Sequence, residues 1–122
     1  MKNNQERSRQ LLELACEANA EGDLKKEVRL LKKSAALGSS EAKVNLGNLY
    51  SEGRGVELSP SLAKDLYRSA FKSGCVYGAT ALGVQYKNEG KLRLAALWLK
   101  KAASMGEDWA QDALAEISGR NQ

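Results

Sequence analysis

The segment GDLKKEVRLLKKSAALG at residues 22–38 aligns without a gap on GKLRLAALWLKKAASMG at residues 90–106. Leu31 matches Leu99, and the Lys-Lys pair that follows each leucine occurs in both segments. Apolar residues three and four positions apart predict an amphipathic helix in each segment, and the flanking glycines mark its two ends. The chain therefore contains internal repeats, which are typical of proteins built from stacked helix pairs.

A second element alternates with the first and recurs 36 residues further along the chain. Its members are Gly38, Leu46, Gly47 and Tyr50, then Gly74, Leu82, Gly83 and Tyr86. Together the two elements predict about three and a half helix pairs. The expected helices span residues 5–21, 24–37, 40–52, 60–73, 76–89, 91–105 and 107–119. We expect a single domain over residues 1–122, with repeats at 5–38, 39–74 and 75–106 and a capping helix at 107–119.

Glycine has two roles in this pattern. Six glycines follow the expected helix ends, where a left-handed backbone favours glycine; they are Gly22, Gly38, Gly53, Gly74, Gly90 and Gly106. Gly47 and Gly83 lie inside helices, where glycine costs about 1 kcal/mol relative to alanine. We expect the neighbouring helix to approach closely at both positions. The opposing surface is expected to consist of small residues, namely Ala35, Ala36, Ala70, Ala102 and Ala103.

The middle unit carries small and aromatic residues at fixed spacing: Ala42, Leu46, Gly47, Tyr50, the loop Gly53-Arg54-Gly55-Val56, Ala63, Ala70 and Gly74. This run resembles the signature of the Sel-one-like repeat, a subclass of the tetratricopeptide superfamily. The flanking units have short turns in place of the GxGV loop and resemble ordinary tetratricopeptide units, so the resemblance covers about residues 9–118. It implies an all-α solenoid that forms a right-handed superhelix, with the first helix of each pair on a concave face and the second outside. It also implies protein binding.

The composition argues against catalysis. The chain contains no histidine, so it has neither an imidazole base near neutral pH nor a histidine ligand for zinc. Its two cysteines, Cys16 and Cys75, are too few for a four-thiolate metal site. We expect them to be half-buried helix residues in a reducing compartment, and a disulfide between them is the alternative. Gly53-Arg54-Gly55 lacks the sequence context of a phosphate-binding loop. We therefore expect no enzyme, no cofactor and no metal.

No segment of the sequence resembles a signal peptide or a membrane span. The first ten residues, MKNNQERSRQ, are polar and contain no apolar signal-peptide core. No run of about 18 apolar residues occurs anywhere in the chain. We expect a cytoplasmic protein with no membrane partner.

Charge is divided unequally between the two kinds of helix. The net charge is +4, from 19 basic and 15 acidic residues. Basic residues outnumber acidic ones by 12 to 2 in the expected second helices, whereas acidic residues outnumber basic ones by 11 to 5 in the first helices, with Arg120 included. Solvation of an outer face explains the lysines. The alternative function is nucleic-acid binding through this basic face, although we expect no exposed aromatic residues between the lysines to stack on bases.

The implied geometry places one face of each first helix in the groove. The residues expected there are Arg9, Leu12, Cys16, Asn19, Glu41, Val44, Asn48, Glu52, Tyr77, Thr80, Val84, Lys87, Asn88, Trp109, Asp112 and Glu116. Tyr77 and Trp109 are expected to anchor a partner, because amphipathic aromatic residues concentrate binding energy. The alternatives are that Tyr77 packs within the solenoid and that Trp109 covers its last repeat. Four further aromatic residues, Tyr50, Phe71, Tyr86 and Trp98, are expected to pack in the core.

These features predict a non-enzymatic interaction module that holds a peptide or a protein surface in its concave groove. An adaptor, a chaperone and an inhibitor of the immunity-protein type all fit this prediction. The acidic side of the groove suits a basic partner. We expect a monomer, or a weak dimer formed through the ends of the repeat stack.

Overall fold

The computed structural model describes residues 3–120, which form seven helices and no strand. The helices are α1 (Asn4–Glu21), α2 (Leu24–Ala36), α3 (Ser40–Glu52), α4 (Pro60–Lys72), α5 (Val76–Asn88), α6 (Leu92–Ser104) and α7 (Asp108–Arg120). All seven predicted helices are present, and each helix end lies within one residue of its predicted position.

Local sequence signals fix the helix ends. Side chains cap the first turns of α1 to α4 by accepting hydrogen bonds from backbone N–H groups; the capping residues are Asn3, Asp23, Ser39 and Ser59. The six glycines predicted at helix C-termini all have positive φ, between 67° and 102°. At Gly22 this conformation lets the N–H of Asp23 donate to the carbonyl oxygen of Ala18 at 2.9 Å, which satisfies an acceptor that the helix end leaves unpaired.

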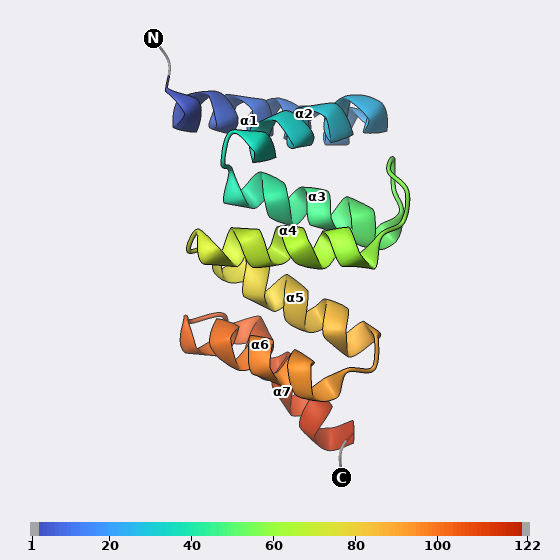
Figure 1. Cartoon of the computed structure of the whole chain (residues 1–122), viewed down its shortest axis with the longest axis vertical. Helices are drawn as coiled ribbons and strands as arrows, with labels where there is room; N and C mark the ends of the chain where they lie inside the picture. Colours follow the sequence, from blue (N-terminus) through green and yellow to red (C-terminus); the bar gives the residue numbers. More distant parts are fainter. Residues whose placement is uncertain (1–2, 121–122) are drawn as a thin grey trace.

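The helices stack in chain order, and each packs on its neighbour in sequence (Figure 1). The odd-numbered helices also contact one another, since α3 touches α5 and α5 touches α7. No pair of even-numbered helices comes together to the same extent. The odd-numbered helices therefore form the closely packed inner side of the solenoid, and the even-numbered helices form its outside. Contact between α1 and α3 is weaker than between α3 and α5.

The apolar core has two parts that meet in the middle of the stack. Leu31 and Leu46 belong to the part built from α1, α2 and α3. Leu82 and Leu99, both completely buried, belong to the part built from α4 to α7. Tyr50 packs against both parts. Because each helix pair contacts only its neighbours, the stability of such a stack is close to a sum of local terms.

The two glycines inside helices make room for large side chains of the following helix. A Cβ atom on Gly47 would lie 2.6 Å from the ring of Tyr67, and one on Gly83 would lie 2.7 Å from Cγ of Leu99. The predicted close approach is confirmed. The prediction that alanines form the opposing surface is wrong, because a tyrosine ring and a leucine side chain fill the space that each missing Cβ leaves.

A third close approach, at Gly78 in the first turn of α5, was not predicted. A Cβ atom there would lie 2.5 Å from the backbone oxygen of Tyr67 and 2.7 Å from the backbone nitrogen of Phe71. The backbones of α4 and α5 therefore touch at this point. The repeat pattern gives no signal for it, since the equivalent positions in the other units are Ala42 and Ala110.

The aromatic side chains pack as predicted, whereas the cysteines do not. Phe71 and Trp98 form an edge-to-face pair with ring centroids 5.4 Å apart, and Tyr86 is buried in the core. Both cysteines are free thiols, so the disulfide alternative is wrong. Cys16 is exposed on α1 rather than half-buried, and Cys75 is half-buried but precedes α5 instead of lying within a helix.

The two ends of the stack leave repeat positions uncovered. Leu46 and Leu82 are 5% and 0% exposed, whereas the equivalent Leu14 in α1 is 43% exposed, because no described helix packs on that side of α1. At the other end Ala115, which corresponds to Gly47 and Gly83, is exposed on α7. The neighbouring Gln111 and Ser118 are also exposed and polar, as expected for the terminal unit of a solenoid.

Part of the basic charge on the outer helices is used within the fold. The Lys64 ammonium of α4 lies 2.8 Å from Oε1 of Glu89, and the Lys91 ammonium lies 3.4 Å from the same oxygen. Both ammonium groups also lie over the ring of Tyr86, at 5.1 and 5.9 Å from its centroid. Arg68 donates a hydrogen bond to the hydroxyl of Tyr86. These three cations link successive helices, and Lys64, whose side chain is 15% exposed, contributes little to a surface for partners.

Glu89 makes the stability of the fold depend on pH. Hydrogen bonds from Lys64, Gln85 and Lys91 lower its pKa from 4.5 to about 2. The unfolded chain therefore binds more protons between these values, so the stabilisation is complete above pH 4.5 and is lost as the pH falls towards 2. We expect Glu89→Gln to lower the free energy of unfolding at pH 7 by about 1 kcal/mol, and this difference to shrink at pH 3. Urea titrations at both pH values measure it.

Asp65→Asn serves as the control for this prediction. Asp65 pairs with Arg68 at 3.3 Å, but its side chain is 67% exposed, and such pairs contribute little to stability. We expect Asp65→Asn to behave like the unchanged protein at both pH values. A loss of stability in Glu89→Gln that is equal at pH 7 and pH 3 would contradict the assignment.

Candidate functional site

Two hollows lie between α1 and α3, one near each end of these helices. The larger one, here called the N-terminal cavity, has a volume of about 940 Å³ and is lined by the first turns of α1 and α3 and by the turns at residues 37–39 and 73–75. The smaller one, here called the asparagine pocket, has a volume of about 280 Å³. It is lined by later turns of α1 and α3, by Glu27 and Leu31 of α2, and by Arg54 in the loop after α3. Both hollows therefore lie where the odd-numbered helices are least tightly packed.

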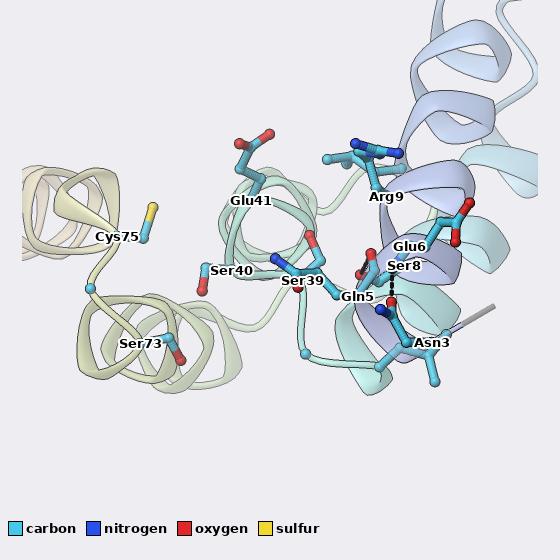
Figure 2. Close-up of a pocket in the computed structure, with 14 residues that line it drawn as sticks. Asn3, Gln5, Glu6, Ser8, Arg9, Ser39, Ser40, Glu41, Ser73 and Cys75 are labelled. Atoms are coloured by element: carbon cyan, nitrogen blue, oxygen red, sulfur yellow. Dashed lines mark hydrogen bonds between the residues drawn. The ribbon is translucent and has the colours of Figure 1, made fainter. Parts of the chain in front are cut away.

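The N-terminal cavity is polar. Figure 2 shows Arg9 and Glu41 projecting to the same side from α1 and α3. No ion pair joins these two charges among residues 3–120, so both remain available to a partner. Two of the hydroxyl groups nearby are occupied by the fold, since Ser39 caps α3 and Ser8 donates to the carbonyl oxygen of Gln5 at 2.9 Å.

Two of the three carboxamide groups that line the asparagine pocket, those of Asn19 and Asn48, are held in opposite orientations. Nδ2 of Asn19 donates to both carboxylate oxygens of Glu27 at 3.2 Å. Because a carboxylate only accepts, this contact fixes the carboxamide and leaves its Oδ1 without a partner in the described part of the chain. The hydroxyl of Tyr67 donates to Oδ1 of Asn48 at 2.7 Å, which leaves the Nδ2 donors of Asn48. These two asparagines thus present one acceptor oxygen and one donor amino group to the pocket.

Buried side chains of the second helices fix these two asparagines. Glu27 is 8% exposed and Tyr67 is 2% exposed, and burial raises the pKa of Tyr67. Glu27 is one of the two acidic residues predicted in the second helices, but it does not belong to the outer face, because its side chain faces inwards and lines the asparagine pocket. The sequence does hold a signal for this, since Glu27 lies one and two helical turns before the inward-facing Leu31 and Ser34. No pattern in the sequence indicates that Tyr67 would orient the carboxamide of Asn48.

The structure brings together the predicted groove residues of α1 and α3. Arg9, Leu12 and Glu41 line the N-terminal cavity, and Cys16, Asn19, Asn48 and Glu52 line the asparagine pocket. Val44 is half-buried and lines neither hollow. Asn45, which sequence reasoning missed, also lines the asparagine pocket.

The predicted residues of α5 and α7 line neither hollow. Lys87 and Glu116 form an ion pair at 2.7 Å between the two helices, so the Glu116 carboxylate already has a counter-ion within the fold. The hydroxyl of Thr80 donates to the carbonyl oxygen of Val76 at 3.4 Å. Val84 is half-buried, whereas Asn88 and Asp112 are exposed.

Two exposed aromatic residues stand at the start of α5 and α7. Tyr77 is 59% exposed and Trp109 is 50% exposed. The alternative that Tyr77 packs within the solenoid is therefore wrong. Aromatic side chains with this much exposed surface are suited to a protein interface.

Three further features are absent from the described residues: clusters of metal ligands, unpaired buried polar atoms and helices able to span a membrane. Within residues 3–120, no three potential metal ligands cluster and no buried polar side-chain atom lacks a hydrogen-bond partner. None of the seven described helices is long and apolar enough to cross a membrane. The two hollows instead offer amide, carboxylate and guanidinium groups, which bind polar ligands by hydrogen bonds and charge.

Antiparallel helix pairs stacked in chain order, with their first helices in contact, define an α-solenoid repeat protein. The Sel1 repeat model matches residues 1–19, 40–75 and 78–107, and the chain belongs to this family. The resemblance inferred from the GxGV loop and the Leu-Gly pairs is confirmed.

Solved structures of other proteins share this fold. The chain is similar to a Sel1 repeat protein from Oxalobacter formigenes, with a TM-score of 0.74 and 28% identity over 89% of this chain and 88% of that one. It is also similar to c5321, a protective antigen present in uropathogenic Escherichia coli strains that displays an SLR fold, with a TM-score of 0.80 and 28% identity. That alignment covers 93% of this chain, which spans only 26% of c5321. No curated protein matches the sequence.

Proposed function

We propose that this chain is a non-catalytic binding module that holds an extended polypeptide of a partner protein along its inner face, centred on the cleft between α1 and α3. Sel1 repeats commonly mediate protein–protein interaction, which supports a protein partner in general. The more specific proposal rests on the chemistry of the asparagine pocket.

The two oriented asparagines are the observation that carries the proposal. A peptide group has one N–H donor and one C=O acceptor. Oδ1 of Asn19 and Nδ2 of Asn48 offer the complementary pair on the wall of a single pocket. Because Glu27 and Tyr67 already hold both carboxamides, binding a peptide costs less side-chain entropy than it would with mobile groups.

Charge supports a basic partner. Glu41 lies at the N-terminal cavity and Glu52 at the asparagine pocket, and Asp112 is exposed on α7. Acidic groups along a groove attract and orient a basic segment. Two roles fit such a partner: an inhibitor of the immunity-protein type and an adaptor. We propose that the chain has one of these roles and acts in the cytoplasm.

The basic outer face is the weaker candidate. Arg93, Lys100 and Lys101 are exposed on α6, as nucleic-acid binding requires. However, Leu94 and Leu97 are 42% and 50% exposed between them, and apolar aliphatic side chains do not neutralise phosphates. A gel shift that appears at low salt and persists at physiological salt would favour this outer face over the inner one.

Affinity capture tests the proposal. The full chain is immobilised and exposed to an extract of the cells that produce it, and bound proteins are identified by mass spectrometry. We expect one dominant partner that Asn19→Ala/Asn48→Ala fails to retain and that Lys100→Glu/Lys101→Glu retains. A partner kept by the first variant and lost by the second would place the site on the outer face.

The exposed aromatic residues give a separate prediction. We expect Tyr77→Ala and Trp109→Ala each to weaken binding of the captured partner by at least about 1 kcal/mol, because each removes a large side chain that a partner would cover. Isothermal titration calorimetry measures the affinity, and circular dichroism shows whether the helical content is intact. If both truncations leave the affinity unchanged, the partner does not extend over the start of α5 and α7.

A further inference from the structure

We infer that the asparagine pocket receives a lysine or arginine side chain of the bound polypeptide, with the carboxylate of Glu27 as its counter-ion. The inference rests on the proposed function and specifies which residue type of the partner enters this pocket.

The carboxylate of Glu27 is buried without a cation. Glu27 is 8% exposed, and its carboxylate accepts hydrogen bonds only from Nδ2 of Asn19 in the described structure. All five ion pairs among residues 3–120 involve other carboxylates. A buried charge is costly unless an opposite charge accompanies it. A cation from a partner would supply the missing charge.

The charges at the rim do not neutralise the pocket. Glu52 and Arg54 pair at 3.4 Å, and each side chain is 52% exposed. Both residues line the pocket together with Glu27, so its three ionisable groups other than Cys16 sum to one negative charge. An incoming ammonium or guanidinium group therefore meets a net attraction.

The size and walls of the pocket suit a long cationic side chain. Its volume of about 280 Å³ lies below the roughly 300–1,000 Å³ of typical small-molecule sites, as expected for a pocket that takes one side chain. Ala15, Leu31 and Leu49 supply apolar wall against which the methylene groups of lysine or arginine can pack. The polar groups of the pocket thus match the charged end of such a side chain, and the apolar walls match its methylene groups.

Peptide selection tests this inference. A display library of random dodecapeptides is panned against the full chain, and the strongest binder is synthesised. We expect the selected peptides to share a lysine or arginine. We expect Glu27→Gln to weaken the strongest binder by at least about tenfold, because glutamine still accepts from Asn19 but carries no charge. Glu13→Gln is the matched control, since Glu13 is an exposed carboxylate on α1 that lines neither hollow.

A change in the peptide separates charge from folding. Replacing its arginine by citrulline, or its lysine by norleucine, removes the cation while the protein stays unchanged. We expect this peptide to bind the unchanged protein about tenfold more weakly, and to bind the unchanged protein and Glu27→Gln equally well. If circular dichroism shows that Glu27→Gln does not fold, the inference is tested by comparing the neutral and the basic peptide on the unchanged protein alone.

The two free cysteines report where the peptide lies. Cys16 lines the asparagine pocket and Cys75 lines the N-terminal cavity. In the Cys75→Ser variant, we expect the bound peptide to slow the reaction of Cys16 with a thiol reagent by at least about tenfold, since a covered thiolate cannot attack. In the Cys16→Ser variant, Cys75 reports in the same way on the larger cavity.

The outcomes distinguish this inference from the proposed function. Peptides that protect Cys16 but share no basic residue, or that bind equally well with citrulline, overturn the inference and leave the groove as a peptide site. A library that yields no peptide able to protect Cys16 or Cys75 counts against the proposed function and against the inference with it.

Discussion

Gly78→Ala is expected to lower the free energy of unfolding by about 3 kcal/mol. The added Cβ would lie 2.5 Å from the backbone oxygen of Tyr67 and 2.7 Å from the backbone nitrogen of Phe71. Backbone atoms of a helix have no rotamer to change, so α4 and α5 must move apart. Because stability in a solenoid depends on contacts between neighbouring units, separating these two helices weakens the middle of the stack. Urea titration followed by circular dichroism measures the loss.

Two other glycines provide the comparison. At Gly83 the added Cβ would meet the side chain of Leu99 at 2.7 Å, with the nearest backbone atom at 3.3 Å, so Gly83→Ala should cost less than Gly78→Ala. At Gly119, within α7, nothing lies within 4 Å of the added Cβ, so Gly119→Ala should be neutral or stabilising by up to about 1 kcal/mol. Equal melting curves for Gly78→Ala and Gly119→Ala would disprove contact between the backbones of α4 and α5.

Asn19→Ala/Asn48→Ala is expected to weaken partner binding by about a hundredfold, that is, by about 2–3 kcal/mol. Each substitution removes one hydrogen bond to the bound polypeptide and leaves a peptide group unpaired at the protein surface. Each single substitution, Asn19→Ala or Asn48→Ala, should weaken partner binding by about tenfold. Titration calorimetry with the captured partner, or with the selected peptide, measures the effect.

An asparagine outside the cleft controls for the loss of an amide. Asn4 is exposed at the start of α1 and lines neither hollow, so Asn4→Ala should leave the affinity unchanged. Similar affinities for Asn4→Ala and for the double variant would show that the asparagine pair makes no contact with the partner, even if the partner covers Tyr77 and Trp109.

The helices could be predicted to within one residue because their ends depend on neighbours in sequence. The capping side chain of Ser39 and the positive φ of Gly22 act within one turn of their own helices. The repeat of Leu31 at Leu99 likewise reflects one packing requirement that occurs twice along the chain. Such signals need no knowledge of how the helices are arranged in space.

The candidate site could be predicted only in part. Offsets from the Leu-Gly pairs placed Asn19 and Asn48 on the inner face, and both line the asparagine pocket. The same offsets treated the inner faces of all four odd-numbered helices as equivalent. The structure distinguishes them, because the ion pair between Lys87 and Glu116 bridges α5 and α7, whereas the cleft between α1 and α3 contains the two hollows.

The sequence by itself determined the seven helices and their repeat in pairs, since periodicity and caps are local properties, and its resemblance to the Sel-one-like repeat implied the α-solenoid. Only the tertiary structure decided that Glu27 is buried facing inwards, that Tyr67 fills the space beside Gly47 and reaches Asn48, and that α4 and α5 touch at Gly78. These contacts join residues of different helices. They depend on how closely and at what rotation two helices pack, which is set by many side chains together and by no single stretch of sequence.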